Sequence, residues 1–172
     1  MINRLRKIKL VPVALAVLLF ALGFSASAQG PDFSFRAVNG PPITADSLRG
    51  QAVVLGFGAS WLPLTRNQME GLKKLADQYA GRGVAVYWVS TESDSAKSKN
   101  YVPDEDLRAL ERKYKLTVLR DPDGTISKRM GVDQLPATVI LNKQGQVAAT
   151  LGGLDPNADL AKQLSDRLDK IL

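Results

Sequence analysis

Residues 52–66 read Ala-Val-Val-Leu-Gly-Phe-Gly-Ala-Ser-Trp-Leu-Pro-Leu-Thr-Arg. A predicted strand ends and a predicted helix begins within this stretch. The first seven residues are an unbroken run without polar side chains, which is typical of a strand buried on both faces of a sheet. A helix is expected to begin near Pro63, because proline suits the first position of a helix. Apolar side chains then recur at helical spacing and predict its buried face: Met69, Leu72, Leu75, Ala76 and Tyr79. A buried strand that leads into an amphipathic helix indicates an α/β fold.

The flanking sequence predicts further elements on both sides of this unit. Upstream, Phe33 and Phe35 alternate with polar residues ahead of a turn at 39–42, which indicates a small hairpin. Downstream, strands are expected at 84–89, 117–120, 137–141 and 146–151. Helices are expected to start near Pro103 or Asp104 and at Asp155-Pro156, where a capping residue precedes a proline. The resulting order is β-α-β-α-β-β-α. The early strands are therefore expected to be parallel and the last two antiparallel.

The first 28 residues have the pattern of a cleavable secretory signal. A basic stretch precedes an apolar run at 10–24, and Ala26-Ser27-Ala28 follows with the small-x-small pattern of a cleavage site. The run is short for a membrane-spanning helix, which needs about 20 residues, so a cleaved signal is favoured over a retained anchor. Residues 29–172 are then expected to form one periplasmic or otherwise extracytoplasmic domain, with no membrane attachment after cleavage.

Composition narrows the possible chemistry. Of the 23 Lys and Arg residues, 4 lie in the signal-like segment, which leaves 19 against 17 acidic residues, so the basic balance does not indicate a nucleic-acid partner. The chain has neither cysteine nor histidine. Disulfide exchange, thiolate metal sites and Ser-His-Asp catalysis are therefore excluded, and no metal or cofactor is expected.

Residues 57–66 resemble the segment Phe-Trp-Ala-Ser-Trp-Cys-Pro-Pro-Cys-Arg of the extracytoplasmic TlpA/ResA-like thioredoxins, relatives of the redoxin and AhpC-TSA proteins. Residues 89–93, 121–124 and 131–138 are similar to further motifs of that family, in the same order. The resemblance implies a thioredoxin fold, with a central mixed β-sheet flanked by helices and an N-terminal β-hairpin extension. It also implies a cis peptide bond before Pro136, beside which a free backbone edge could pair with an extended peptide.

The same resemblance shows what this chain lacks. A Cys-X-X-Cys pair works because a thiolate at a helix N-terminus attacks a disulfide, and a second thiol one turn later resolves the product. In this chain the two positions are Leu62 and Thr65, so the motif has degenerated to Leu-Pro-Leu-Thr. Thiol-disulfide oxidoreductase activity is expected to be absent, although a description by family likeness alone would assign it.

Two hypotheses replace thiol chemistry. The first is a non-catalytic binding or scaffold protein of the cell envelope that holds an extended polypeptide or an envelope protein. Its groove is predicted to consist of Trp61, Leu62, Pro63, Leu64, Leu135 and Pro136, either as an open patch or as a site closed by inward-turned leucines. The second is an enzyme with a non-thiol site, which would need ionisable groups around Ser60, Thr65 and Glu92.

Three polar features are given simpler interpretations. Glu92 is interpreted as a solvated loop residue, because it has no thiol to serve. Residues 121–124 are read as a β-turn rather than a calcium loop, since too few oxygen ligands follow. Lys97 and Lys99 are interpreted as solvated surface, with a contact to an acidic partner as the alternative.

Overall fold

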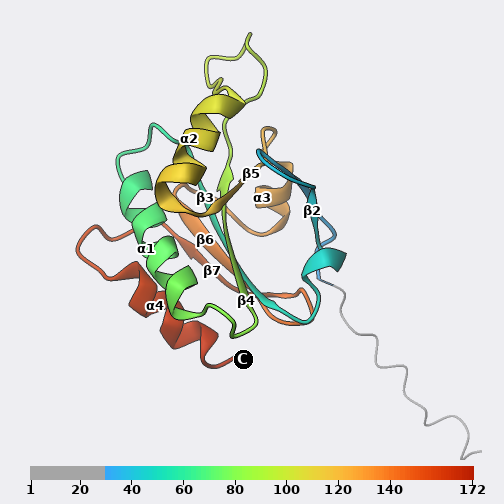
Figure 1. Cartoon of the computed structure of the whole chain (residues 1–172), viewed down its shortest axis with the longest axis vertical. Coiled ribbons are helices and arrows are strands. Elements are labelled where there is room, and N and C mark those ends of the chain that lie inside the picture. Colours follow the sequence, from blue (N-terminus) through green and yellow to red (C-terminus); the bar gives the residue numbers. More distant parts are fainter. Residues whose placement is uncertain (1–29) are drawn as a thin grey trace, which may run out of the picture.

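The computed structural model describes residues 30–172, and its strands form one seven-stranded sheet (Figure 1). The strands are β1 (Ser34–Ala37), β2 (Ile43–Thr44), β3 (Ala52–Gly58), β4 (Val84–Ser90), β5 (Thr117–Arg120), β6 (Ala137–Leu141) and β7 (Val147–Gly152). Their order across the sheet is β2-β1-β5-β4-β3-β6-β7. The helices are α1 (Thr65–Gln78), α2 (Asp104–Tyr114), α3 (Thr125–Arg129) and α4 (Leu160–Leu168), with a short 3-10 helix, η2 (Asp46–Leu48). The predicted signal segment 1–28 lies outside the described residues.

The sheet is mixed, as the sequence predicted. Strand β3 runs parallel to β4 and antiparallel to β6, and β4 runs parallel to β5. The predicted N-terminal hairpin is confirmed by the antiparallel pairing of β1 with β2. The α/β thioredoxin-type architecture expected from the family resemblance is therefore present.

Each face of the sheet buries its own apolar core. On one face, α1, α2 and α4 pack over a cluster that includes Leu72, Trp88 and Leu164. On the other face, the N-terminal arm and the segment around α3 cover a cluster that includes Phe35 and Phe57. Strand β3 is buried at every residue because both faces are covered, which explains its unbroken apolar sequence.

The strand register places four loops at one end of the sheet. Gly58 pairs with Ser90, Ser90 pairs with Arg120, and Phe57 pairs with Ala137. The loops that leave β3, β4 and β5 therefore lie beside the loop that enters β6. All the residues in which the sequence indicated function lie at this end, because three of these strands are parallel and β6 is antiparallel to β3.

Helix boundaries differ from the sequence predictions at three places. Helix α1 begins at Thr65, two residues beyond Pro63, and the short helix α3 was not predicted. Helix α4 begins at Leu160 rather than at Asp155, so that prediction was wrong. The side chain of Asp159 accepts a hydrogen bond from the Lys162 amide at 3.0 Å and caps the helix, whereas Asp155 accepts one from Asn157 at 2.9 Å in a local turn. Within residues 30–172, no helix has the length and apolar content needed to cross a bilayer.

Candidate peptide-binding site

Two successive tight turns connect β3 to α1. The amide of Leu62 donates to the carbonyl of Ala59 at 3.1 Å, and the amide of Thr65 donates to the carbonyl of Leu62 at 3.1 Å. No side chain caps the helix at Leu64. The side chains at 61–64 are therefore carried by a compact segment that is held by its own backbone.

The two positions that the resemblance assigns to cysteines hold unreactive groups. Leu62 is half-buried and has no ionisable atom. Thr65 is 4% exposed, and its hydroxyl donates to the carbonyl of Ala59 at 2.6 Å. The Thr65 hydroxyl thus connects the first residue of α1 to the residue that follows β3, and neither position offers a nucleophile for disulfide exchange.

Glu92 corrects a sequence interpretation, because it is 2% exposed and not a solvated loop residue. Its carboxylate accepts hydrogen bonds from the Ser60 amide at 2.9 Å, the Ser60 hydroxyl at 2.7 Å and the Ser90 hydroxyl at 3.0 Å. The physical reason is the parallel pairing of β3 with β4, which brings residue 92 back against the loop after β3. Ser60 and Ser90 supply the donors that make this burial of a carboxylate tolerable.

Gln68 and Trp88 are buried side chains that connect α1 to the strands next to the site. The Gln68 amide nitrogen donates to the carbonyls of Phe57 at 3.3 Å and Ala137 at 2.8 Å, and its oxygen accepts from the Trp88 indole at 3.0 Å. A Cβ atom at Gly58 would lie 3.0 Å from the Gln68 oxygen and 3.2 Å from the Trp88 ring. Trp88 therefore occupies space that a side chain at 58 would need, at the position where the resembling family segment has tryptophan. The sequence analysis did not predict that Trp88 fills the space of a side chain at position 58, although the glycine there was a signal.

The structure separates the six predicted groove residues by exposure. Trp61 is 67% exposed and Leu135 is 39% exposed. Pro63 is also exposed, Leu62 and Leu64 are half-buried, and Pro136 is buried after a cis peptide bond. The pairing of Phe57 with Ala137 places both segments at the same end of the sheet. The arrangement is intermediate between the open patch and the closed site that the sequence left as alternatives.

Trp61 has a partner that the sequence did not indicate. Its indole nitrogen donates to the side-chain carbonyl of Asn100 at 3.0 Å, from the loop between β4 and α2. The ring is thus fixed at one edge while most of its surface faces solvent. No local pattern could have identified this pair, because 39 residues separate the two side chains.

An ion-pair network lies behind this loop. Asp104 accepts two hydrogen bonds from the Arg36 guanidinium, at 2.7 and 3.1 Å, and one from Arg120 at 2.6 Å. The hydrogen bonds from Arg36 and then from Arg120 lower the pKa of Asp104 from 3.8 to about 2, against the opposing effect of burial. The carboxylate of Asp104 therefore holds both arginines at the start of α2 across the whole neutral range.

The requirement for a non-thiol enzyme is only partly met. Ser60 does lie beside a carboxylate, but both oxygens of Glu92 already accept hydrogen bonds, one of them from the Ser60 amide itself. Thr65 points to Ala59 instead. Within residues 30–172, no lysine or arginine forms an ion pair with Glu92, and no three acidic side chains come together as a metal site would require. The Ser60–Glu92 contact therefore has the geometry of a structural contact that holds the loop after β3, and not that of an activated nucleophile.

The turn at 121–124 is confirmed. The Gly124 amide donates to the Asp121 carbonyl at 3.0 Å, as in a hydrogen-bonded β-turn. The Asp121 carboxylate accepts from the amides of Ile126 and Ser127 at the start of α3. Both carboxylate oxygens of Asp121 therefore accept hydrogen bonds from backbone amides of the protein itself.

Comparison with known proteins agrees with this geometry. Residues 26–150 match the AhpC/TSA family. The chain belongs to the AhpC/TSA family. Other proteins similar to it are thiol-disulfide oxidoreductase ResA of Bacillus thuringiensis (27% identical, over 83% of this chain and 76% of ResA) and thioredoxin-like protein YneN of Bacillus subtilis (30% identical, over 73% and 71%). The exposed lipoprotein thioredoxin Etrx1 of Streptococcus pneumoniae shares the fold, with a TM-score of 0.62 and 24% identity over 79% of this chain and 99% of Etrx1. This AhpC/TSA family member has no cysteine in its 172 residues.

Proposed function

We propose that this protein is an exported accessory protein of the cell envelope that binds an extended polypeptide and carries out no thiol chemistry. One observation carries the proposal: the two positions where the resembling family has its cysteines are a half-buried leucine in the turn before α1 and a buried, hydrogen-bonded threonine at the first residue of α1. With no cysteine elsewhere in the chain, the fold keeps its sheet and loops but has no group that could exchange disulfides.

Binding is supported by what remains at the end of the sheet. Trp61 and Leu135 expose large apolar side chains on segments that leave β3 and enter β6, two adjacent strands. Aromatic and aliphatic side chains that are exposed near one another often mark protein-binding surfaces. The backbone before Pro136 is outside any strand, so an extended peptide could pair with it.

Export is supported by the signal-like sequence of residues 1–28 and by the description of the similar Etrx1 as an exposed lipoprotein. The expected test is mass spectrometry of the protein recovered from the envelope fraction. We expect a mature chain that begins at Gln29. An uncleaved chain in the membrane fraction would favour the alternative of a retained anchor.

The binding function is tested by photo-crosslinking in intact cells. A benzoylphenylalanine at Leu135 should trap a polypeptide partner, and Leu62→Asp should abolish the adduct, because a charge is costly in an apolar contact. Val147→Asp is the control for an added surface charge: Val147 has the same 39% exposure as Leu135, but it pairs with Leu141 at the far end of β6. Equal adduct yields from Leu62→Asp and the unsubstituted protein would contradict the proposal, provided that both variants unfold at the same temperature.

A further inference from the structure

The loop between β4 and α2 is an ordered Ω-loop over residues 93–101. It is closed at its base, where the Ser93 amide donates to the Asn100 carbonyl at 2.8 Å and the Val102 amide donates to the Ser93 carbonyl at 3.1 Å. Inside it, the Ser98 amide donates to the Ser95 carbonyl at 2.9 Å. Figure 1 shows this loop projecting beyond the rest of the molecule above α2. Its closed base and internal bonds are those of a compact surface loop rather than a loose connection.

Arg120 anchors the Ω-loop from below. Its side chain is fully buried at the end of β5, and its guanidinium donates to the carbonyls of Glu92 at 3.3 Å, Ser93 at 3.0 Å and Val102 at 3.1 Å. The same group pairs with Asp104 at 2.6 Å. One buried cation thus holds both ends of the Ω-loop, because several carbonyl dipoles and one carboxylate compensate its charge.

The Ω-loop is joined to the proposed binding site at two points. Asn100, within the loop, accepts the hydrogen bond from the Trp61 indole at 3.0 Å. Glu92, just before the loop, holds the amide and hydroxyl of Ser60. The exposed ring of Trp61 and the Ω-loop therefore form one connected surface.

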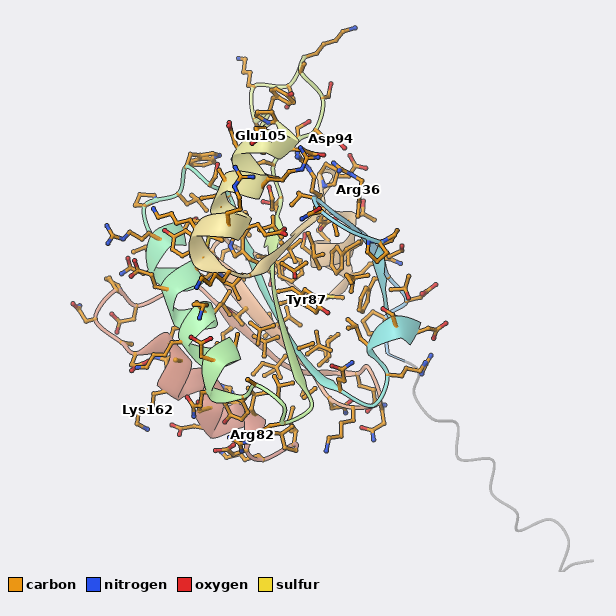
Figure 2. All side chains as sticks on the ribbon, in the orientation of Figure 1. Arg36, Arg82, Tyr87, Asp94, Glu105 and Lys162 are labelled. Carbon is orange, nitrogen blue, oxygen red and sulfur yellow. The ribbon has the colours of Figure 1, made fainter. Side chains whose placement is uncertain are left out.

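The projecting part of this surface carries unpaired positive charge. Lys97 and Lys99 are exposed, and neither forms an ion pair with any of the residues 30–172. The acidic residue of the loop, Asp94, lies 3.8 Å from Arg36, which offsets its charge (Figure 2). Lys99 directly precedes Asn100 in the chain, so its backbone is about 4 Å from that of the residue that holds Trp61.

We propose that the Ω-loop forms the side of the binding surface next to Trp61. It selects acidic polypeptide segments in which an apolar residue lies against the Trp61 ring. This inference rests on the proposed function and adds the chemistry of the partner. Exposed lysines beside an exposed aromatic ring complement a segment in which carboxylates flank an apolar side chain. Charge of this kind acts through the rate of association and through selectivity, and it is screened by salt.

The test uses three fluorescein-labelled peptides that share a Leu-Val-Leu centre flanked by aspartates, asparagines or lysines. Fluorescence anisotropy with the mature protein should show the aspartate peptide binding at least about 10-fold more tightly than the lysine peptide at low salt. The preference should shrink towards equality at about 0.5 M salt. The double variant Lys97→Glu with Lys99→Glu should reverse it.

A charge-matched control separates local from overall charge. The double variant Lys162→Glu with Lys170→Glu changes net charge equally on and after α4, and Figure 2 places Lys162 at the opposite end of the molecule from the Ω-loop. This control should keep the preference for the aspartate peptide. Asn100→Ala should weaken all three peptides by a similar factor, because it frees Trp61 without altering the charge.

Three results would overturn the inference: equal affinity for the three peptides, no binding of any of them at about 1 mM, or a preference that survives Lys97→Glu with Lys99→Glu. Binding to phosphatidylglycerol vesicles with no peptide preference would also overturn it and would assign the surface to lipid. The crosslink at Leu135 tests the proposed function separately. An adduct that depends on Leu62 but not on the two lysines would leave the proposed function standing and remove this inference alone.

Discussion

Glu92 accepts hydrogen bonds from both the amide and the hydroxyl of Ser60, at 2.9 and 2.7 Å, across the end of two parallel strands. This pair fixes Ser60, the second residue after β3, on the path to the degenerate motif. Its neighbours Trp61 and Leu62 therefore begin from a defined backbone position. The buried carboxylate of Glu92 therefore has a structural role, at the edge of a site that contains no thiol.

Glu92→Gln should lower the free energy of unfolding by about 1–2 kcal/mol, because the neutral amide oxygen is a weaker acceptor than the carboxylate and the amide NH2 group cannot accept a hydrogen bond at all. Ser60→Ala should cost about 1 kcal/mol. The two changes should not add, and a double-mutant cycle from urea denaturation should yield a coupling of about 1 kcal/mol. Strict additivity would show that the observed contact does not contribute to stability.

Gln68→Glu should destabilise the protein strongly at pH 7. A carboxylate cannot donate to the carbonyls of Phe57 and Ala137, so the expected loss is about 3 kcal/mol. Burial should raise the pKa of the introduced carboxyl above that in the unfolded chain. The folded variant then binds more protons than the unfolded one, so the deficit relative to wild type should narrow as pH falls from 7 to 5.

The control for this variant is Asn67→Asp, the same amide-to-carboxylate change at the neighbouring exposed position of α1. Its stability relative to wild type should stay within about 0.5 kcal/mol at both pH values. A deficit of Gln68→Glu that is the same at pH 5 and pH 7 would argue against a buried, unpaired carboxylate.

Asp104 should contribute to stability at neutral pH and lose that contribution in acid. Its pKa is about 2 in the folded protein, below the ordinary 3.8, because Arg36 and Arg120 hold the charged form. The folded state resists protonation, so the contribution is complete above about pH 5 and disappears as pH falls through about 2. The stability difference between wild type and Asp104→Asn should therefore be constant from pH 5 to 8 and shrink between pH 4 and 2.

Asp94→Asn provides the comparison for Asp104, because Asp94 is 3.8 Å from the same Arg36 but is half exposed. It should change stability by less than about 0.5 kcal/mol at any of these pH values. Chemical denaturation at each pH measures both variants. A large effect of Asp94→Asn would mean that exposed charge, rather than the Arg36–Asp104–Arg120 network, stabilises the start of α2.

Restoring the two cysteines should restore thiol chemistry. Wild type should fail to reduce insulin disulfides, whereas Leu62→Cys with Thr65→Cys should gain measurable turnover, because the first sulfur would lie in the turn just before α1 and the second at the first residue of the helix. Leu62→Cys with Thr65→Ser retains a thiol but lacks the resolving one, and it should form mixed disulfides without turnover. Activity of the wild-type chain itself would contradict the loss of redox function.

Local patterns in the sequence were sufficient for much of the fold. Strands β3 and β6 lie where the sequence predicted them, because strands that are buried on both faces have few polar side chains. The predicted start of α4 at Asp155 was wrong because Asp155 and Asp159 both precede residues that are compatible with a helix. Only packing against α1 decides between them: Leu160 is the first residue of that segment to be buried. The loss of both cysteines needed no structure at all.

By itself, the sequence determined the layered α/β fold and the absence of thiol chemistry. The first follows from the spacing of apolar residues within each element, and the second follows from the absence of cysteine. Only the tertiary structure revealed the contacts that shape the site: Glu92 with Ser60, Trp88 with Gln68, and Asn100 with Trp61. The members of these pairs lie 32, 20 and 39 residues apart. Their meeting depends on strand order and register, which no local pattern encodes, and so a buried carboxylate was mistaken for a solvated one.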